Sequence, residues 1–304
     1  IIYPSSKLAT YNLSKKFIEQ PNFELQHIYR ALEVISKENE FIQAELYKNS
    51  LKYSKRNTGI LYYDCTNYFF ETEQENGLRQ YGPSKEHRPN PIVQMGLFMD
   101  GDGIPLAFNI TSGNTNEQTT LTPTEEKILK DFELSKFIVC TDAGLASTAN
   151  RKFNDKQDRA FITTQSVKKL KKFLKEWALD TKGWSLSGDD KEYDISQLEE
   201  TIETKQYYQN KVFYKERWIK ENDLEQKLIV TYSLKYKDYQ RRIRNNQIER
   251  AQKAIETNSI KLDKCNQNDY KRFVSRTLLT QDGEIADKKV MSLNLEQIEK
   301  EEQY

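Results

Sequence analysis

The stretch "FIVCTDAGLAS", residues 137–147, places a carboxylate at the mouth of an apolar strand. Residues 137–141 are typical of a buried strand, and Asp142 follows them directly. The earlier stretch "ILYYDCTNYFFE", residues 60–71, sets Asp64 inside an even more apolar run. Asp is depleted in strands, and burying its charge is costly unless something pairs with it. One such Asp is typical of a turn or a helix cap, but two in the same setting indicate a shared role.

The segments between these two stretches predict how they are joined. Residues 91–114 show two apolar runs around "DGDG", a strong turn signal, and so predict a hairpin. A helix is predicted over 122–132, with Thr122 or Thr124 as its cap, and strands over 136–142 and 159–165. Three antiparallel strands, a helix and a return strand beside the first predict a ribonuclease-H-like α/β core with a mixed sheet.

In that arrangement the first and fourth strands lie side by side, so Asp64 and Asp142 are expected to face each other. Two close carboxylates repel unless a cation lies between them. Hard divalent cations prefer carboxylate oxygens, and Mg²⁺ or Mn²⁺ is the expected ion. Two such ions about 4 Å apart can activate a water or a 3′ hydroxyl in phosphodiester chemistry.

Three regions are expected along the chain. Residues 1–57 are predicted to form a helical N-terminal region, and residues 58–168 the first part of the core. Residues 169–304 are predicted to be a long insertion after the last core strand, with a β-hairpin and a basic helix over 236–257. The basic stretch at 51–59 is interpreted either as a packing segment or as a DNA contact.

Composition excludes several classes of protein. Lys and Arg total 47 and Asp and Glu total 46, so a formal net charge of +1 does not by itself indicate a nucleic-acid partner. The three Cys and two His have no metal-ligand or disulfide spacing, which argues against a zinc site and fits a reducing cytoplasm. No apolar run is long enough to span a membrane, so no membrane partner is expected.

The motifs resemble those of bacterial insertion-sequence transposases with a DDE catalytic triad. The resemblance covers roughly residues 20–304 and is carried by "YYDCTNYFFE", the segment from "GPSKEHRP" to "SGNTNE", and "FIVCTDAGLAS". It implies that Asp64 is the first catalytic Asp and Asp142 the second. Thr66 and Glu71 match a polar pattern after the first Asp. The segment 82–89, with Lys85 and Arg88, resembles the basic stretch of the family, although an ordinary solvated loop explains it as well.

The third motif of that family, Y-x2-R-x3-E-x6-K on one helix face, is not found. The nearest match is Tyr239, Arg242, Glu249 and Lys253, but its spacings are wrong. Glu249 is more simply an i to i+4 partner of Lys253 on a solvated helix. The chain begins with Ile and its last segment has no stop signal, so we expect a fragment whose third catalytic Glu lies beyond Tyr304. A fragment of that kind is expected to be inactive alone.

The resemblance implies double-stranded DNA as the partner, both the terminal inverted repeats of an element and a target, bound by a homodimer on paired ends. It implies a cytoplasmic, nucleoid-associated protein. Lys and Arg neutralise phosphates without reading sequence, and two basic clusters are candidates for that role: Lys168, Lys169, Lys171 and Lys172; and Arg241, Arg242 and Arg244. Two alternatives stay open: a non-catalytic DNA-binding remnant of a decayed element, and a nuclease on the same fold that cleaves without strand transfer.

Overall fold

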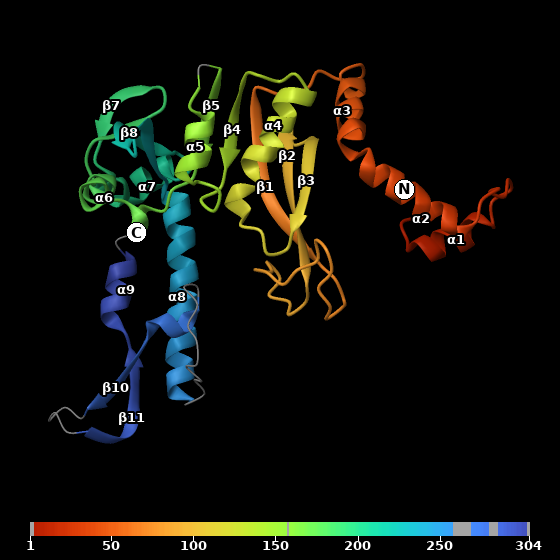
Figure 1. The fold of residues 1–304 in the computed structure, drawn as a ribbon. Coiled ribbons are helices and arrows are strands. Elements are labelled where there is room, and N and C mark those ends of the chain that lie inside the picture. Colours follow the sequence, from red (N-terminus) through yellow and green to blue (C-terminus); the bar gives the residue numbers. More distant parts are fainter. Residues whose placement is uncertain (1–2, 157, 258–268, 280–284, 303–304) are drawn as a thin grey trace. The chain divides into compact units, whose positions relative to one another are not determined.

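A computed structural model describes residues 3–156, 158–257, 269–279 and 285–302 (Figure 1). The chain divides into two compact units, Ile1–Gln165 and Ser166–Tyr304, and each is described by itself. Within the described ranges, no helix combines the length and the apolar composition that crossing a membrane requires.

The first unit is built on a five-stranded mixed sheet in the order β3-β2-β1-β4-β5 (Figure 1). Strand β2 runs antiparallel to its neighbours β1 and β3, whereas β4 and β5 run parallel to β1. This is the order of a ribonuclease-H-like core, so the predicted fold class is confirmed. The strands span Ile60–Phe69, Ile92–Asp100, Pro105–Ser112, Phe137–Thr141 and Arg159–Thr163, in chain order.

Alternation along the central strands separates a buried face from an open one. Leu61 and Tyr63 of β1 are almost fully buried and pack with Leu121 and Ile128 of helix α4 (Leu121–Asp131). The residues between them face the other way, because side chains alternate along a strand. On that open face, four large apolar side chains lie between 43% and 58% exposed: Tyr62, Tyr68, Ile110 and Ile162.

Helix α4 begins one residue before the predicted range, and its predicted cap is wrong. Thr120 occupies the N-cap position and makes no side-chain cap bond. Thr124 lies inside the helix, where its hydroxyl donates to the carbonyl of Thr120 at 2.8 Å. The alternative candidate, Thr122, points its hydroxyl to Asn150 of α5 (Thr148–Asn154) at 3.4 Å. A Thr hydroxyl satisfied inside the first turn or by another helix has no need to act as a cap.

The helical N-terminal region consists of α1 (Lys7–Ser14), α2 (Leu25–Lys37) and α3 (Asn39–Ser50). Helix α3 contacts the core through side chains that include Tyr47 and Gln43. Tyr47 stacks on Phe132, with ring centroids 4.9 Å apart, and Gln43 accepts a hydrogen bond from the N–H of Phe108 at 2.7 Å.

The basic stretch after α3 contributes to packing through Arg56. Its guanidinium is buried against the carboxylate of Asp100, with Nε 2.6 Å from Oδ2. It also donates to Ser50 Oγ at 2.9 Å and to the carbonyls of Ile104 and Pro105 at 3.1 Å. Arg56 therefore ties the end of α3 to the β2–β3 turn, and of the two interpretations of this stretch, packing is the one its contacts favour.

The second unit contains a four-stranded antiparallel sheet in the order β7-β6-β8-β9. Its core gathers Trp184, Leu198, Phe213 and Leu234. The predicted hairpin is β8 and β9, and its turn residues Asn222 and Asp223 both have positive φ, as a type I′ turn requires. The strands span Trp184–Leu186, Asp189–Tyr193, Phe213–Glu221 and Leu224–Tyr232, and the helices beside them are α6 (Lys172–Leu179) and α7 (Ile202–Tyr208).

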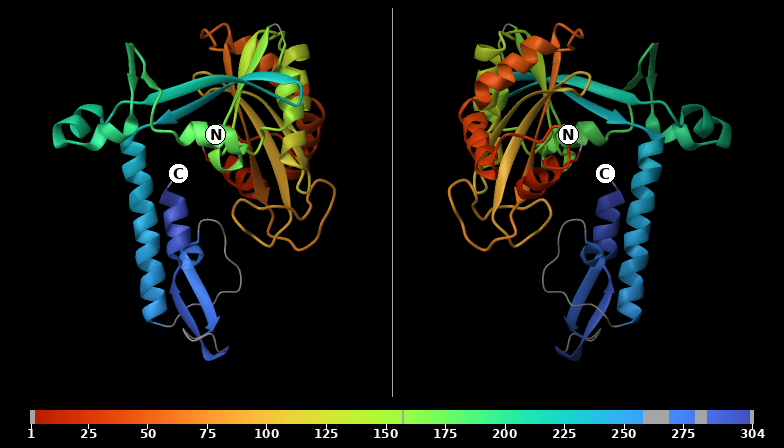
Figure 2. Two further views of the ribbon diagram at one scale, coloured as in Figure 1. Left: turned by 90° about the vertical axis from the view of Figure 1, so that its left-hand side faces the viewer. Right: turned by 90° about the vertical axis from the view of Figure 1, so that its right-hand side faces the viewer.

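The predicted basic helix is α8 (Leu234–Glu256), which runs beside a second hairpin, β10 (Val274–Leu279) and β11 (Ile285–Leu293) (Figure 2). Helix α9 (Leu295–Glu302) follows, and Asn294 caps it by accepting the N–H of Gln297 at 3.1 Å. Arg272 fastens these elements together, donating to Gln247 of α8 at 2.6 Å and to Glu301 of α9 at 2.9 Å.

Candidate active site

The pairing register of β1 and β4 determines where the two predicted catalytic Asp residues lie. The strands run parallel, and Tyr62 pairs with Cys140 at the end of their ladder. Counting two residues onward along each strand reaches Asp64 and Asp142. An even step along a strand keeps a side chain on the same face, so Asp64 lies on the open face, and Asp142 directly follows the last residue of the neighbouring strand β4. Both residues are exposed.

Asp64 has a cation beside it. Lys85, from the loop before β2, places Nζ 3.7 Å from Oδ1 of Asp64 and also donates to the backbone carbonyl of Cys65. The N–H of Cys65 donates to the same Oδ1 at 2.8 Å. The Asp64 side chain is 68% exposed, and an ion pair that exposed contributes at most about 1 kcal/mol. Lys85 can therefore be displaced from Asp64 at little cost by a more highly charged cation.

Asp142 is oriented by a tight turn of its own loop. Its Oδ1 accepts the N–H groups of Gly144 and Leu145 at 3.0 and 3.2 Å. Its backbone carbonyl accepts the hydroxyl of Thr163, at the end of β5, at 3.1 Å. Side chains of Asp commonly bond the backbone two residues onward in this way. The D-x-G pattern at 142–144 is the sequence signal for this turn.

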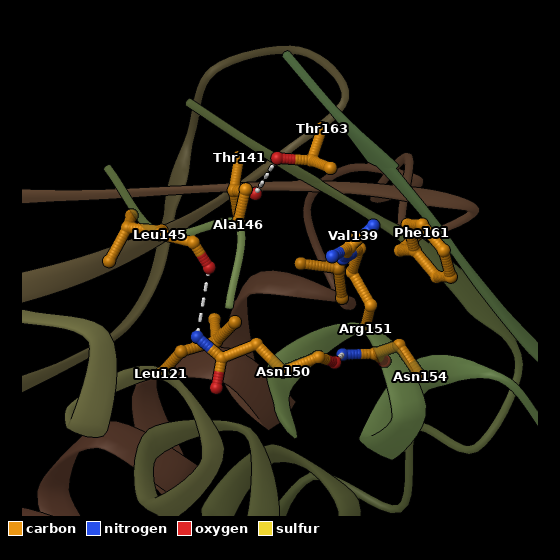
Figure 3. A pocket seen from close by; sticks show the side chains of 10 residues that line it. All are labelled: Leu121, Val139, Thr141, Leu145, Ala146, Asn150, Arg151, Asn154, Phe161 and Thr163. Carbon is orange, nitrogen blue, oxygen red and sulfur yellow. Dashed lines mark hydrogen bonds between the residues drawn. The ribbon is translucent and has the colours of Figure 1, made fainter. Parts of the chain in front are cut away.

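Asn150 holds that loop in place, and sequence reasoning missed it. Its amide donates to the carbonyl of Leu145 at 2.9 Å, as Figure 3 shows, and to the carbonyl of Gln118 at 3.0 Å. Asn150 is buried, and Leu145 beside it is buried in the core. The hydroxyl of Thr141 bonds that of Thr163 at 3.1 Å in the same view. The Asp142 loop is therefore fixed to both β5 and the loop before α4.

Directly beneath Asp64, the buried face carries a small polar cluster. The hydroxyl groups of Tyr63 and Thr120 lie 2.7 Å apart, and Cys65 Sγ lies 3.3 Å from the Thr120 hydroxyl. Burial raises the pKa of both the Cys65 thiol and the Tyr63 phenol. Both groups are therefore neutral near neutral pH, so neither is an activated nucleophile.

The other predicted DNA-binding residues outside α8 include Arg88, Lys168 and Lys169. Arg88 lies over the Phe69 ring, 4.7 Å from its centroid, and pairs with Glu86 at 3.5 Å. Lys168 and Lys169 lie exposed in the short helical turn η2 (Val167–Lys169) of the second unit.

The basic face of α8 is partly neutralised within the chain. Arg244 is 14% exposed and pairs with Glu302 at 2.9 Å. Arg241 lies 3.7 Å from Glu199, whose pKa is lowered chiefly by its hydrogen bond from Lys237. Arg242 is exposed and lies over the Tyr239 ring at 5.8 Å. Of the three predicted Arg residues, Arg242 is the most available to a phosphate. Glu249 is exposed on the same helix, α8.

Asp64 and Asp142 supply exposed carboxylate oxygens, the ligand type that a divalent cation requires. Mg²⁺ is typically held by one or two carboxylates while water and substrate phosphates complete its coordination. Among the residues that the structure describes, no group of three or more His, Cys, Asp or Glu side chains is close enough to hold a metal.

The sheet order of the first unit defines the class of proteins built on a ribonuclease-H-like core. The family described as "Transposase DDE domain" matches residues 68–228, more than half of the chain, and the chain belongs to that family. The matched range includes Asp142 and begins four residues after Asp64.

One solved structure is similar, the "Mos1 transposase paired-end complex with left transposon end". The sequences are 14% identical over 52% of this chain and 59% of that chain, with a TM-score of 0.25. The similarity thus spans less than two thirds of the Mos1 chain. No curated protein matches the sequence.

Proposed function

We propose that this transposase-family chain acts in DNA transposition, with Asp64 and Asp142 as its catalytic carboxylates. The single observation that supports the proposal is the register of β1 and β4: their ladder ends at Tyr62 and Cys140, and the exposed Asp64 and Asp142 each lie two residues further on. The reaction is cleavage of DNA at the ends of an element and joining of the freed 3′ hydroxyl to a target. The partners are the terminal inverted repeats and target DNA, bound by a homodimer on paired ends of a bacterial insertion sequence.

Asp64 and Asp142 would hold Mg²⁺ or Mn²⁺, which supplies charge stabilisation to the phosphate and lowers the pKa of an attacking hydroxyl. The chain's own residues do the positioning. The Gly144 and Leu145 N–H groups fix Oδ1 of Asp142, so its carboxylate is oriented before any ligand arrives. Lys85 neutralises Asp64 in the free protein and lies where it can contact a phosphate once the carboxylate is engaged.

DNA beyond the reacting phosphate would be held by exposed cations. Lys85, Arg88 and Arg242 are the best placed, because their side chains are exposed or half-exposed. Lys169 belongs to the same set, whereas Lys168 helps to lower the pKa of Glu301, Arg241 lies 3.7 Å from Glu199, and Arg244 is largely buried beside Glu302. Such contacts supply affinity that falls with salt and does not depend on sequence.

The test uses iron as a probe of the metal site. Fe²⁺ bound at Asp64 and Asp142, with ascorbate and peroxide, should cut the backbone near both residues, and Asp64→Asn or Asp142→Asn should remove both cuts. Asp102→Asn, in the exposed β2–β3 turn, is the matched control and should leave the cuts unchanged. Transposition of the element in cells should also be lost in both site variants. Cutting that survives in either variant would refute the assigned role of that residue.

A further inference from the structure

A polar groove borders the candidate active site and has no role in the function proposed above. It has a volume of about 560 Å³, within the range of sites that hold small molecules. Lys85, which pairs with Asp64, lies on one side, and Gly144, whose N–H binds Asp142, lies on another. The groove is therefore lined by one residue that contacts each carboxylate. Its lining is completed by Pro83, Ser84, Gln94, Asn114, Thr115, Asn116, Glu117 and Gln118.

Gln94 lies in this groove with half of its amide unused. The residue is 1% exposed, and its Nε2 donates to the carbonyl of Gly113 at 3.3 Å. Its Oε1 is buried and has no hydrogen-bond partner in the part of the chain that the structure describes. The Gly113 carbonyl fixes which corner of the amide is the donor, so the other corner is an acceptor. A buried acceptor without a partner is destabilising, and one that lines a groove indicates a ligand that brings a donor.

The loops around Gln94 are already in close backbone contact, so they cannot move nearer to bring a hydrogen-bond donor to its Oε1. A Cβ on Gly82 would lie 1.9 Å from the carbonyl oxygen of Gly113. A Cβ on Gly113 would lie 2.2 Å from the carbonyl oxygen of Ile92. These two loops are in direct backbone contact and have no room to approach further. The groove is thus a fixed feature of the fold.

Asn150 joins two sides of the groove. Its amide donates to the carbonyl of Gln118, which lines the groove, and to the carbonyl of Leu145, next to the lining residue Gly144. Asn116, which also lines the groove, caps the short helical turn Glu117–Thr119 by accepting the N–H of Gln118 at 3.1 Å. The same buried side chain therefore positions both the Asp142 loop and the polar loop at 114–118.

The chemistry of the lining distinguishes a base from a phosphate. Side-chain amides and hydroxyls predominate, with one cation, Lys85, and one anion, Glu117. A track for a phosphate backbone needs an excess of positive charge, which this groove lacks. Amide side chains, in contrast, are the groups that bind the donors and acceptors on base edges. Lys85 lies on the side nearest Asp64, where a phosphate would be expected.

We propose that this groove binds one unpaired nucleobase of the DNA strand whose phosphate reacts at Asp64 and Asp142, with Gln94 accepting a hydrogen bond from the amino group of that base. Because Oε1 is buried, the Gln94 amide must turn toward the groove to meet its donor, and its three rotatable bonds allow this. Adenine and cytosine carry a suitable amino group, and thymine does not. The identity of the bound DNA strand rests on the proposed function. The chemistry of the groove does not.

The test measures binding without catalysis. Fluorescently labelled duplexes with a short 3′ overhang are titrated in Ca²⁺, and the terminal residue of the overhang is adenine, cytosine, thymine or an abasic sugar. We expect adenine and cytosine to bind roughly tenfold more tightly than the abasic overhang, and thymine to bind less tightly than either. Gln94→Met should remove this preference. Gln74→Met, an exposed position away from the groove, is the matched control and should keep it.

Stability separates a binding role from a structural one. Gln94→Met removes an unsatisfied acceptor along with one hydrogen bond, so the melting temperature should stay close to that of the wild type. Equal binding of all four overhangs by the wild type, or an unchanged preference in Gln94→Met, would overturn the groove proposal even if the iron cuts depend on both Asp residues. If the preference depends on Gln94 but the iron cuts do not depend on the Asp residues, the groove stands and the proposed function fails.

Discussion

Removing Arg56 should unfold the first unit under mild conditions. The guanidinium and the carboxylate of Asp100 are both almost wholly buried, with side chains 4% and 0% exposed. In Arg56→Met, Asp100 keeps only the N–H groups of Asp102 and Ile104, at 3.1 and 2.8 Å. The variant also loses the bonds from Arg56 to Ser50 and to two carbonyls.

The size of the effect follows from leaving a charge buried without its partner. Breaking a buried ion pair from one side costs roughly 3–5 kcal/mol. The first unit spans Ile1–Gln165, and for a domain of that size each kcal/mol lowers the melting temperature by about 2–4 °C. We therefore expect Arg56→Met to melt roughly 6–20 °C below the wild type.

The pH dependence supplies a sharper signature. Burial would raise the pKa of Asp100, but hydrogen bonds from Arg56 and the Ile104 N–H outweigh it and hold the pKa below its usual range. In the wild type this stabilisation is present above the unfolded pKa of about 3.9 and is lost as pH falls through the folded pKa. In Arg56→Met, burial should instead raise the pKa of Asp100. The cost of burying this charge should then disappear as the carboxylate is protonated on acidification. The difference in free energy of unfolding between the wild type and Arg56→Met should therefore narrow.

The assay is urea unfolding of both proteins from near-neutral pH down to about pH 3.5. Lys48→Met is the control, because Lys48 forms an exposed pair with Glu45 and should change stability by less than about 0.5 kcal/mol. A loss below about 1 kcal/mol for Arg56→Met, or a gap that stays constant with pH, would show that the pair does not act as a buried charge pair.

Three further outcomes are expected. Asn150→Ala should lose the hydrogen bonds to Gln118, Leu145 and Thr122, cost about 2–3 kcal/mol in urea unfolding and reduce transposition more than an equally destabilising core variant; equal losses would make its role purely structural. Lys85→Met should tighten Mn²⁺ binding in calorimetry by removing the cation beside Asp64, and weaker Mn²⁺ binding would contradict this. Arg242→Gln should reduce the salt slope of DNA binding by about 1, whereas Arg244→Gln should lower stability and leave that slope unchanged; the reverse result would contradict the assignment of free and paired cations.

The core of the first unit could be predicted because its signals are local. Strands β1 to β5 follow from apolar runs and the "DGDG" turn, and their order follows from the connections between them. The cap of α4 could not be predicted, because Thr120, Thr122 and Thr124 are all plausible caps and tertiary contacts decide among them. Hairpin β6–β7 was missed since its strands are short, and "DDKEY" at 189–193 has almost no apolar alternation.

In the candidate site, too, some residues could be predicted from the sequence and others could not. Asp64 and Asp142 were identified from the sequence because a carboxylate within or after an apolar strand is locally unusual. Asn150 and Gln94 were not, because a polar residue in a helix or strand has no local feature to distinguish it from a solvated one. Their importance comes from partners 19 to 32 positions away in the chain. The acidic partners of Arg241 and Arg244 were hidden for the same reason.

The parallel register of β1 and β4 bears on how this chain can tolerate change in length. Between Phe137 and Asp142, inserting or deleting one residue would turn the carboxylate to the buried face of the sheet, because faces alternate with every residue. The loop between α4 and β4 precedes the paired segment, so added residues there leave the parity intact. Natural insertions and deletions compatible with activity should therefore be frequent in that loop. Within the strand, such changes should be absent or should involve two residues at a time.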